Sequence, residues 1–205
     1  MKRFILATTA ALALAACSDA SPVLDTRAPP EGPNHTIFYG LPAQTIFTDQ
    51  TPTRTSIDAD GGREVATRFT VDTKGLISGF RFWKAAGETG THTAKLWTTS
   101  GTLVASATFS GETSSGWQSV ASNTPIVAGT YVVSVNTNVL MVKTAMYFDT
   151  AGAISHDDVY ADTSYHGQPA GSFPTTAGSG IYFVDVKFRP FICDTEVTQP
   201  CPIPD

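Results

Sequence analysis

GFRFWKAAGETGTHTAKLW, residues 79–97, predicts two strands of a β-sheet joined by a glycine-rich loop. Phe80 and Phe82 alternate with Arg81 and Trp83, and this period of two is typical of a strand with one buried face. The loop GETGT that follows supplies glycines, which reach the positive φ angles that tight turns require. The strand pattern then resumes in TAKLW.

Short strands of the same kind recur along most of the chain. Alternating apolar positions occur at residues 65–71, 103–109, 131–135 and 182–188, with glycine-containing turns between them and no sustained helical period. This pattern predicts an all-β fold, an antiparallel β-sandwich of the jelly-roll kind. Residues 136–180 fit the pattern poorly and are expected to form long loops with a short strand or two, where binding residues often lie.

Residues 1–16 have the features of a lipoprotein signal peptide. Lys2 and Arg3 precede an apolar run that is too short to span a bilayer, and the run ends in LAAC, which resembles the bacterial lipobox. Cleavage would leave Cys17 as the acylated N-terminus, and two or more acyl chains anchor a protein stably. The alternative is a plain signal peptide with a chance cysteine. The residue after Cys17 is Ser18, whereas an aspartate there would favour retention in the inner membrane. The sequence therefore predicts a lipoprotein of the outer membrane, on its periplasmic or cell-surface face.

The mature chain divides into a tether, a domain and a tail. Residues 17–34 are rich in proline and poor in apolar side chains, as in an extended tether. Residues 35–190 are expected to form one β-sandwich domain, followed by a tail at 191–205. Cys193 and Cys201 in the tail are expected to form a disulfide in an oxidising compartment. A metal pair is the alternative, disfavoured because no histidine or further thiol lies near them.

The mature chain is acidic. Residues 1–16 contain two of the 13 basic residues and none of the 18 acidic ones, so the chain from Cys17 onward carries a formal charge of −7. It has no cluster of lysine and arginine of the kind that nucleic acid requires. We therefore expect no nucleic-acid partner, and instead a neutral or cationic one.

Four motifs carry a resemblance to a known family. GFRFWK, GTHTAKLW, ETSSGWQ and VDVKF, within the stretch from about Thr45 to Pro190, resemble the family called domain of unknown function 4082. That family comprises bacterial secreted and surface proteins, often beside immunoglobulin-like and carbohydrate-active domains. The resemblance implies a β-sandwich accessory module and brings no established activity. The chain after Val135 matches the family pattern poorly, so a site built there would be this chain's own.

The chain contains no G-x-S-x-G elbow, no H-E-x-x-H and no phosphate loop with its lysine. We therefore expect a non-catalytic, membrane-anchored binding module of the cell envelope, with carbohydrate as the first-choice ligand. The alternative is a structural or adhesive envelope lipoprotein that contacts other proteins. A carbohydrate-active enzyme is third, because a pair of acid and base carboxylates needs no local motif. His92 is expected to be a hydrogen-bonded structural histidine, with a ligand role as the alternative.

Aromatic side chains are the expected ligand contacts, because a flat ring can stack on the apolar face of a sugar. Trp83 is chosen with its neighbour Arg81, since both alternate with the buried face of their strand. Equally strong candidates lie in the region predicted as loops, namely Tyr160, Tyr165 and His166. The alternative is that the tryptophans belong to the core.

Three carboxylates suggest a structural calcium site. Asp58 and Glu64 flank an acidic glycine-containing turn, and Asp185 lies in the last predicted strand. Calcium binds six to eight oxygens in such turns, and many jelly-roll carbohydrate-binding modules hold one between their first and last strands. The alternative is a solvated turn, with Asp185 paired to Arg68 or Arg81.

Overall fold

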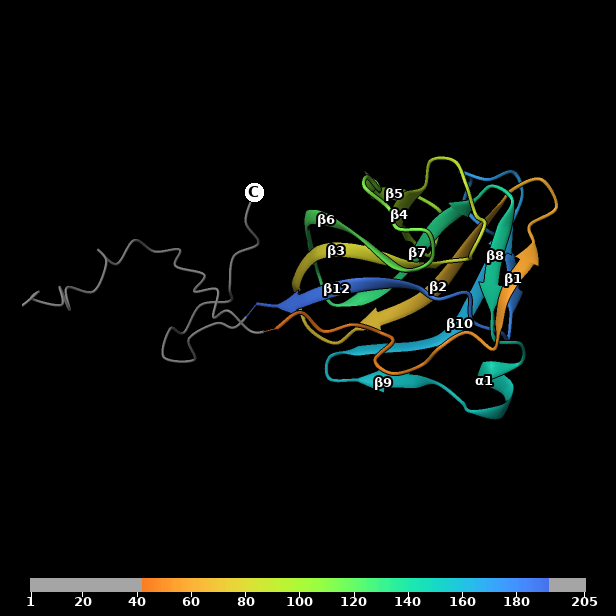
Figure 1. Ribbon diagram of the computed structural model, residues 1–205. Coiled ribbons are helices and arrows are strands. Elements are labelled where there is room, and N and C mark those ends of the chain that lie inside the picture. The colour runs from red at the N-terminus through yellow and green to blue at the C-terminus, as the bar shows by residue number, and fades with distance from the viewer. Residues whose placement is uncertain (1–41, 192–205) are drawn as a thin grey trace, which may run out of the picture. The chain divides into compact units, whose positions relative to one another are not determined.

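The computed structural model describes residues 42–191, which form an all-β domain (Figure 1). The strands are β1 (Arg54–Asp58), β2 (Arg63–Val71), β3 (Gly75–Lys84), β4 (Thr93–Thr98), β5 (Leu103–Thr108), β6 (Gly116–Ile126), β7 (Gly129–Thr137), β8 (Leu140–Lys143), β9 (Ile154–His156), β10 (Val159–Gly167), β11 (Thr176–Gly178) and β12 (Val184–Pro190), with one short helix, α1 (Tyr147–Thr150). No helix in this part of the chain is long and apolar enough to cross a membrane. The predicted signal peptide, Cys17, the tether and the Cys193–Cys201 pair lie outside the described residues.

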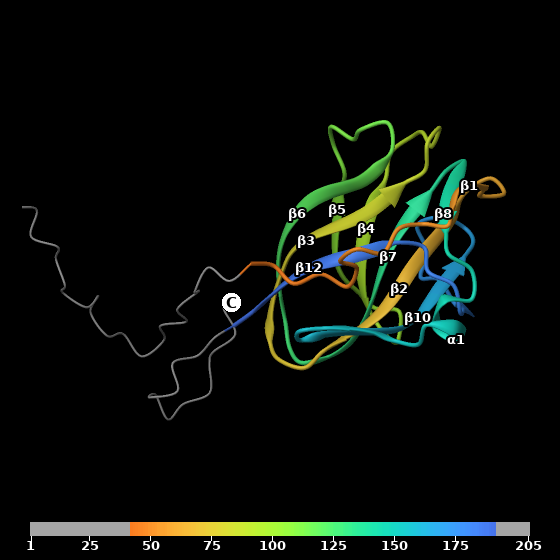
Figure 2. The same ribbon diagram turned by 60° about the horizontal axis from the view of Figure 1, so that its bottom comes forward.

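Two antiparallel sheets make up the sandwich. The large sheet has seven strands in the order β11-β10-β2-β7-β4-β5, with β9 also pairing with β10, and the small sheet has the order β12-β3-β6. Strands β1 and β8 form a separate pair. Figures 1 and 2 show the small sheet lying across the large one. The antiparallel sandwich predicted from the sequence is therefore confirmed, while the jelly-roll connectivity stays a prediction.

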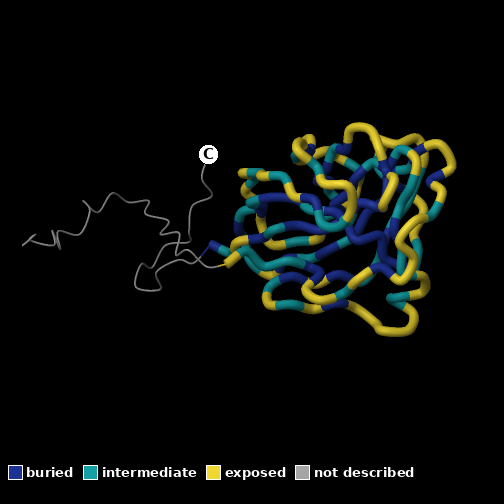
Figure 3. Tube along the Cα trace, viewed as in Figure 1, coloured by how far each residue is buried: buried dark blue, intermediate teal, exposed yellow. Residues whose placement is uncertain are grey.

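The core lies between the two sheets, where the alternating apolar residues meet. Phe80 and Phe82 of β3 are buried there, together with Val65 and Phe69 of β2, as the period of two predicts. Figure 3 shows burial concentrated along the strands and exposure along the connecting loops. Each fully buried side chain of this size contributes about 1.5–3 kcal/mol to folding.

Strand β10 is the main difference from the predicted fold. It pairs along its length with β2, from Val159 opposite Val71 to Gly167 opposite Glu64, in a region where the sequence predicts mainly loops. Its sequence, VYADTSYHG, mixes polar and apolar residues, and the register shifts between Ala161 and Thr163. That irregularity interrupts the alternation by which strands are recognised.

The chain before β1 covers the outer side of the small sheet. Gln44 exchanges two backbone hydrogen bonds with Phe188 of β12, at 2.7 and 2.8 Å. Ile46 and Phe47 are buried, and their amides donate to the side chain of Asp185 at 2.8 and 3.3 Å. This segment therefore closes over the face that Asp185 occupies.

Candidate binding groove on the large sheet

The outer face of the large sheet carries an aromatic cluster separate from the core. Ala66 of β2, Trp97 of β4 and Val132 of β7 are buried together there. Tyr165 of β10 and Phe173 of the loop before β11 pack against them. Ala66 and Val132 alternate with core-facing residues of the same strands, so the cluster lies on the side away from the core.

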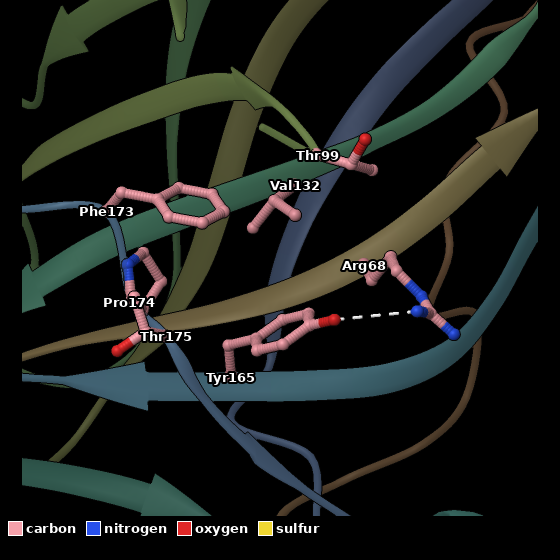
Figure 4. A pocket seen from close by; sticks show the side chains of 7 residues that line it. All are labelled: Arg68, Thr99, Val132, Tyr165, Phe173, Pro174 and Thr175. Carbon is pink, nitrogen blue, oxygen red and sulfur yellow. Dashed lines mark hydrogen bonds between the residues drawn. The ribbon is translucent and has the colours of Figure 1, made fainter. Parts of the chain in front are cut away.

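A groove of about 220 Å³ opens over this cluster (Figure 4). Its lining consists of Arg68, Thr99, Val132, Tyr165, Phe173, Pro174 and Thr175. In Figure 4 the Tyr165 ring lies between Arg68 on one side and the Phe173–Pro174 wall on the other. The Phe173 ring meets the Trp97 ring edge-on at a centroid distance of 5.7 Å, which fixes the wall against the sheet.

An arginine–aspartate pair lies at one end of the groove. Arg68 donates to both carboxylate oxygens of Asp162, Nε to Oδ1 at 3.0 Å and Nη2 to Oδ2 at 2.8 Å. Its third nitrogen, Nη1, lies 3.5 Å from the Tyr165 hydroxyl. Partial burial would raise the pKa of Asp162, but the hydrogen bonds and charge of Arg68 outweigh burial and lower it. Each side chain is about one third exposed, so both remain within reach of a ligand.

A buried carboxylate holds the loop that forms the groove wall. Glu64 accepts hydrogen bonds from the Gly171 amide at 2.6 Å and from the Ser134 hydroxyl at 2.5 Å, and it lies 3.4 Å from Lys95 Nζ. The Trp97 indole in turn donates to Ser134 at 2.8 Å. Burial raises the pKa of Glu64 against the opposing effect of these donors. The chain of hydrogen bonds gives the groove a preformed floor and wall.

Of the predicted ligand residues, only Tyr165 lines the groove. Tyr160 is 39% exposed and pairs with Thr70 elsewhere on the large sheet. His166 follows Tyr165 directly, so it points to the opposite side of β10, and its ring lies 6.0 Å from that of Tyr182. Burial, together with nearby positive charges, lowers the pKa of His166. Neither of these two residues belongs to the lining.

Trp83 and Arg81 lie on the small sheet, away from the groove. The Trp83 ring meets the Trp117 ring edge-on at 5.6 Å, and the Arg81 guanidinium lies 4.3 Å from the centre of the Trp117 ring. Arg81 also forms an ion pair with Asp185 at 2.6 Å. The structure therefore separates the predicted ligand residues into two sets on different sheets.

The three carboxylates predicted to bind calcium are not brought together. Asp58 is exposed and accepts the amide of Asp60, Glu64 is engaged beneath the groove wall, and Asp185 is fully buried with Arg81. Within residues 42–191 no group of three histidine, cysteine, aspartate or glutamate side chains is arranged to hold a metal ion. This corrects the predicted ligand set, because each buried carboxylate already has its own donors. The alternative pairing of Asp185 with Arg81 is confirmed.

His92 is a buried structural residue, as expected. Its Nδ1 lies 2.9 Å from Glu112 and its Nε2 lies 3.0 Å from Glu88. Glu112 is also paired with Lys84 at 2.9 Å, and Glu88 accepts the amides of residues 138–140. Burial would raise the pKa of Glu88, but His92 and these amides outweigh it and lower the pKa. The cluster ties three loops together at one end of the sandwich.

The sequence did not predict Arg68, Asp162 or Phe173 as site residues. The sequence suggests Arg68 only as a partner for Asp185, and it singles out neither Asp162 nor Phe173. The missing information is the pairing of β10 with β2, which sets Thr163 opposite Arg68 and Tyr165 opposite Ala66.

Two parts of the chain match known family models. Residues 49–184 match the family described as Domain of unknown function (DUF4082), and residues 1–18 match the prokaryotic membrane lipoprotein lipid attachment site. No curated protein matches the chain. The first match includes every residue that lines the groove.

Proposed function

The chain belongs to the DUF4082 family and is a lipid-anchored lipoprotein, and we propose that its β-sandwich is a non-catalytic module that binds carbohydrate in the groove. The supporting observation is the aromatic groove itself, with the Tyr165 ring and the Phe173 ring beside the Arg68–Asp162 pair. Aromatic rings offer an apolar surface for the C–H face of a sugar, and a few polar groups then orient it. We also propose that the anchor lies in the outer membrane.

The size and charge of the groove favour a neutral, hydroxyl-rich ligand. Its volume of about 220 Å³ is below the roughly 300–1,000 Å³ of sites for drug-sized molecules, which suits one sugar unit of a longer chain. Arg68 and Asp162 neutralise each other, so the site carries both donors and acceptors without a net charge. Thr99 and Thr175 add two hydroxyl groups to the lining.

The distribution of carboxylates supports a binding role over a catalytic one. Hydrolysis of a glycoside needs two carboxyl groups that face the same bond. None of the residues that line the groove is an acid. The two acids described above are already engaged, Asp162 with Arg68 and Glu64 with the groove wall.

The test is a binding screen of the mature chain against neutral polysaccharides, followed by titration calorimetry. We expect Tyr165→Ala to weaken binding at least about tenfold, which corresponds to about 1.4 kcal/mol. Tyr160→Ala is the matched control, because it removes an exposed tyrosine from the same strand outside the groove, and it should change the affinity less than about twofold. The affinity of the wild-type chain for the polysaccharide should be the same in calcium as in a chelator.

Equal losses for Tyr160→Ala and Tyr165→Ala would place the ligand elsewhere. Absence of saturable binding by the wild-type chain to any neutral polysaccharide would refute the carbohydrate proposal. Circular dichroism of each variant separates lost binding from lost folding.

A further inference from the structure

Strand β5 ends the large sheet, and no other strand within residues 42–191 pairs with its outer edge. Its first two residues, Leu103 and Val104, are 49% and 38% exposed. An edge strand presents unpaired amides and carbonyls that can accept another strand. Natural proteins commonly protect such edges with charges, prolines, bulges or short strands.

The edges formed by β11, β12 and β6 have such protection. β11 is only three residues long, and Gln44 bridges to the outer side of β12. β6 contains Pro125 and an irregular register with β3. β5 has a register shift around Val104, but Ala105–Thr108 then pair regularly with β4. That regular part contains neither a charge nor a proline.

The edge also lies in an almost uncharged part of the chain. Between Lys95 and Lys143 the sequence contains a single charged residue, Glu112. Its side chain is 11% exposed and engaged with Lys84 and His92. β6, the neighbour of β5 across the sandwich, carries no charge either. These two strands therefore contain no charged residue, although the mature chain carries a charge of −7.

We propose that two copies of this chain associate through antiparallel pairing of their β5 edges. Two acidic proteins repel over most of their surfaces, so contact is least opposed where both are neutral. An antiparallel pair of identical strands is self-complementary and closes as a two-fold dimer. The lipid anchor confines copies to one membrane, which raises their effective concentration. This inference is independent of carbohydrate binding.

The two-fold axis restricts the register of such a dimer. An axis perpendicular to the sheet keeps each side chain on its own face, so facing residues must both point outward or both point toward the core. Ser106 therefore faces either Ser106 or a residue two positions away in the second copy. In the first register a charge at this exposed position lies directly opposite the same charge, and in the others it lies diagonally across the axis from it, about 7–8 Å away.

The test uses complementary charges at Ser106 in the mature lipoprotein reconstituted in vesicles. Copies labelled with donor and acceptor fluorophores report association by energy transfer. Ser106→Lys alone and Ser106→Glu alone should each weaken association at least about tenfold, because two like charges would lie opposite or diagonal to each other across the axis. A mixture of Ser106→Lys copies with Ser106→Glu copies should restore it. Thr176→Lys and Thr176→Glu on β11, an exposed position at the opposite edge of the same sheet, should leave it unchanged.

Rescue in the mixed vesicles is decisive, because misfolded variants would not recover on mixing. Wild-type copies that show no energy transfer above the level of random co-confinement would overturn the proposal. So would association that both Ser106 variants retain, or that Thr176 variants abolish equally. Cross-linking of Ser106 to a different envelope protein, with no self-association, would assign the edge to that partner and overturn the dimer.

Discussion

The outer faces of the two sheets each carry an arginine–aspartate pair beside an aromatic ring, but they differ in what covers them. On the small sheet, Asp185 is fully buried and Arg81 is 18% exposed. The segment through Ile46 and Phe47 lies over the pair and donates two amides to Asp185. The hydrogen bonds to Asp185 are thus supplied by the protein itself, so this pair has a structural role.

On the large sheet the corresponding pair is open. Arg68 and Asp162 are each about one third exposed, and the groove lined by Tyr165 lies beside them. The residue types are the same on both faces, yet only this pair has capacity left for a ligand. Cover by a distant segment, rather than residue type, therefore separates a structural pair from a candidate binding pair.

The largest effect should come from breaking the covered pair. Asp185→Asn removes the anionic partner of Arg81, and loss of one member of a buried ion pair typically costs about 3–5 kcal/mol. Urea unfolding followed by tryptophan fluorescence gives the free energy of unfolding. Asp49→Asn, at an exposed aspartate of the covering segment, is the control and should cost less than about 0.5 kcal/mol. An Asp185→Asn loss below about 1 kcal/mol would contradict the structural role of the covered pair.

A smaller effect is expected from Glu64 beneath the open face. Glu64→Ala leaves the Gly171 amide without its acceptor and should cost about 1–3 kcal/mol. It should also weaken ligand binding, because the groove wall loses its attachment. Glu64→Gln keeps one acceptor oxygen and should lose less than half as much stability. Equal affinity of the alanine variant and wild type would show that the wall does not depend on Glu64.

Glu64 also predicts a pH dependence. Burial raises its pKa in the folded protein above the unfolded value, so the folded state holds the proton to higher pH. The wild type should therefore lose stability as the pH rises from the unfolded to the folded pKa of Glu64. Glu64→Gln has no proton to lose, and its unfolding free energy should be flatter over that interval.

Much of the fold could be predicted because it depends on local alternation. Phe80 and Phe82 face the core, while Arg81 and Trp83 face outward, as their spacing indicates. The same alternation placed Asp185 on the outward side of its strand, which made a pairing with Arg81 foreseeable. These inferences need only the period of a strand.

The site could be predicted only in part because it depends on register and cover. The sequence suggests Tyr165 as an aromatic residue in a region predicted as loops, but its neighbours come from β2, β4 and β7. The shift in β10 near Asp162 decides which side chains meet Arg68, and no local pattern reports it. The cover over Asp185 and Arg81 comes from the segment before β1, far away in the sequence.

The smallest effect should come from the open pair. Asp162→Asn breaks a partly exposed ion pair, which is worth at most about 1 kcal/mol at neutral pH. Arg68 lowers the pKa of Asp162 in the folded protein, so this contribution is complete above the unfolded pKa and is lost as the pH falls through the folded pKa. The wild type and the variant should therefore converge in unfolding free energy once the pH is below the folded pKa of Asp162.

The same variant should weaken carbohydrate binding more than it weakens the fold, because Asp162 keeps Arg68 positioned at the end of the groove. Titration at neutral pH and urea unfolding of the same sample give the two numbers. A stability loss close to that of Asp185→Asn would mean that solvent access does not distinguish the two pairs. A small stability loss with clearly reduced affinity would instead show that the open pair acts in ligand binding. Its charges would then contribute to affinity, because the protein leaves them exposed to the ligand.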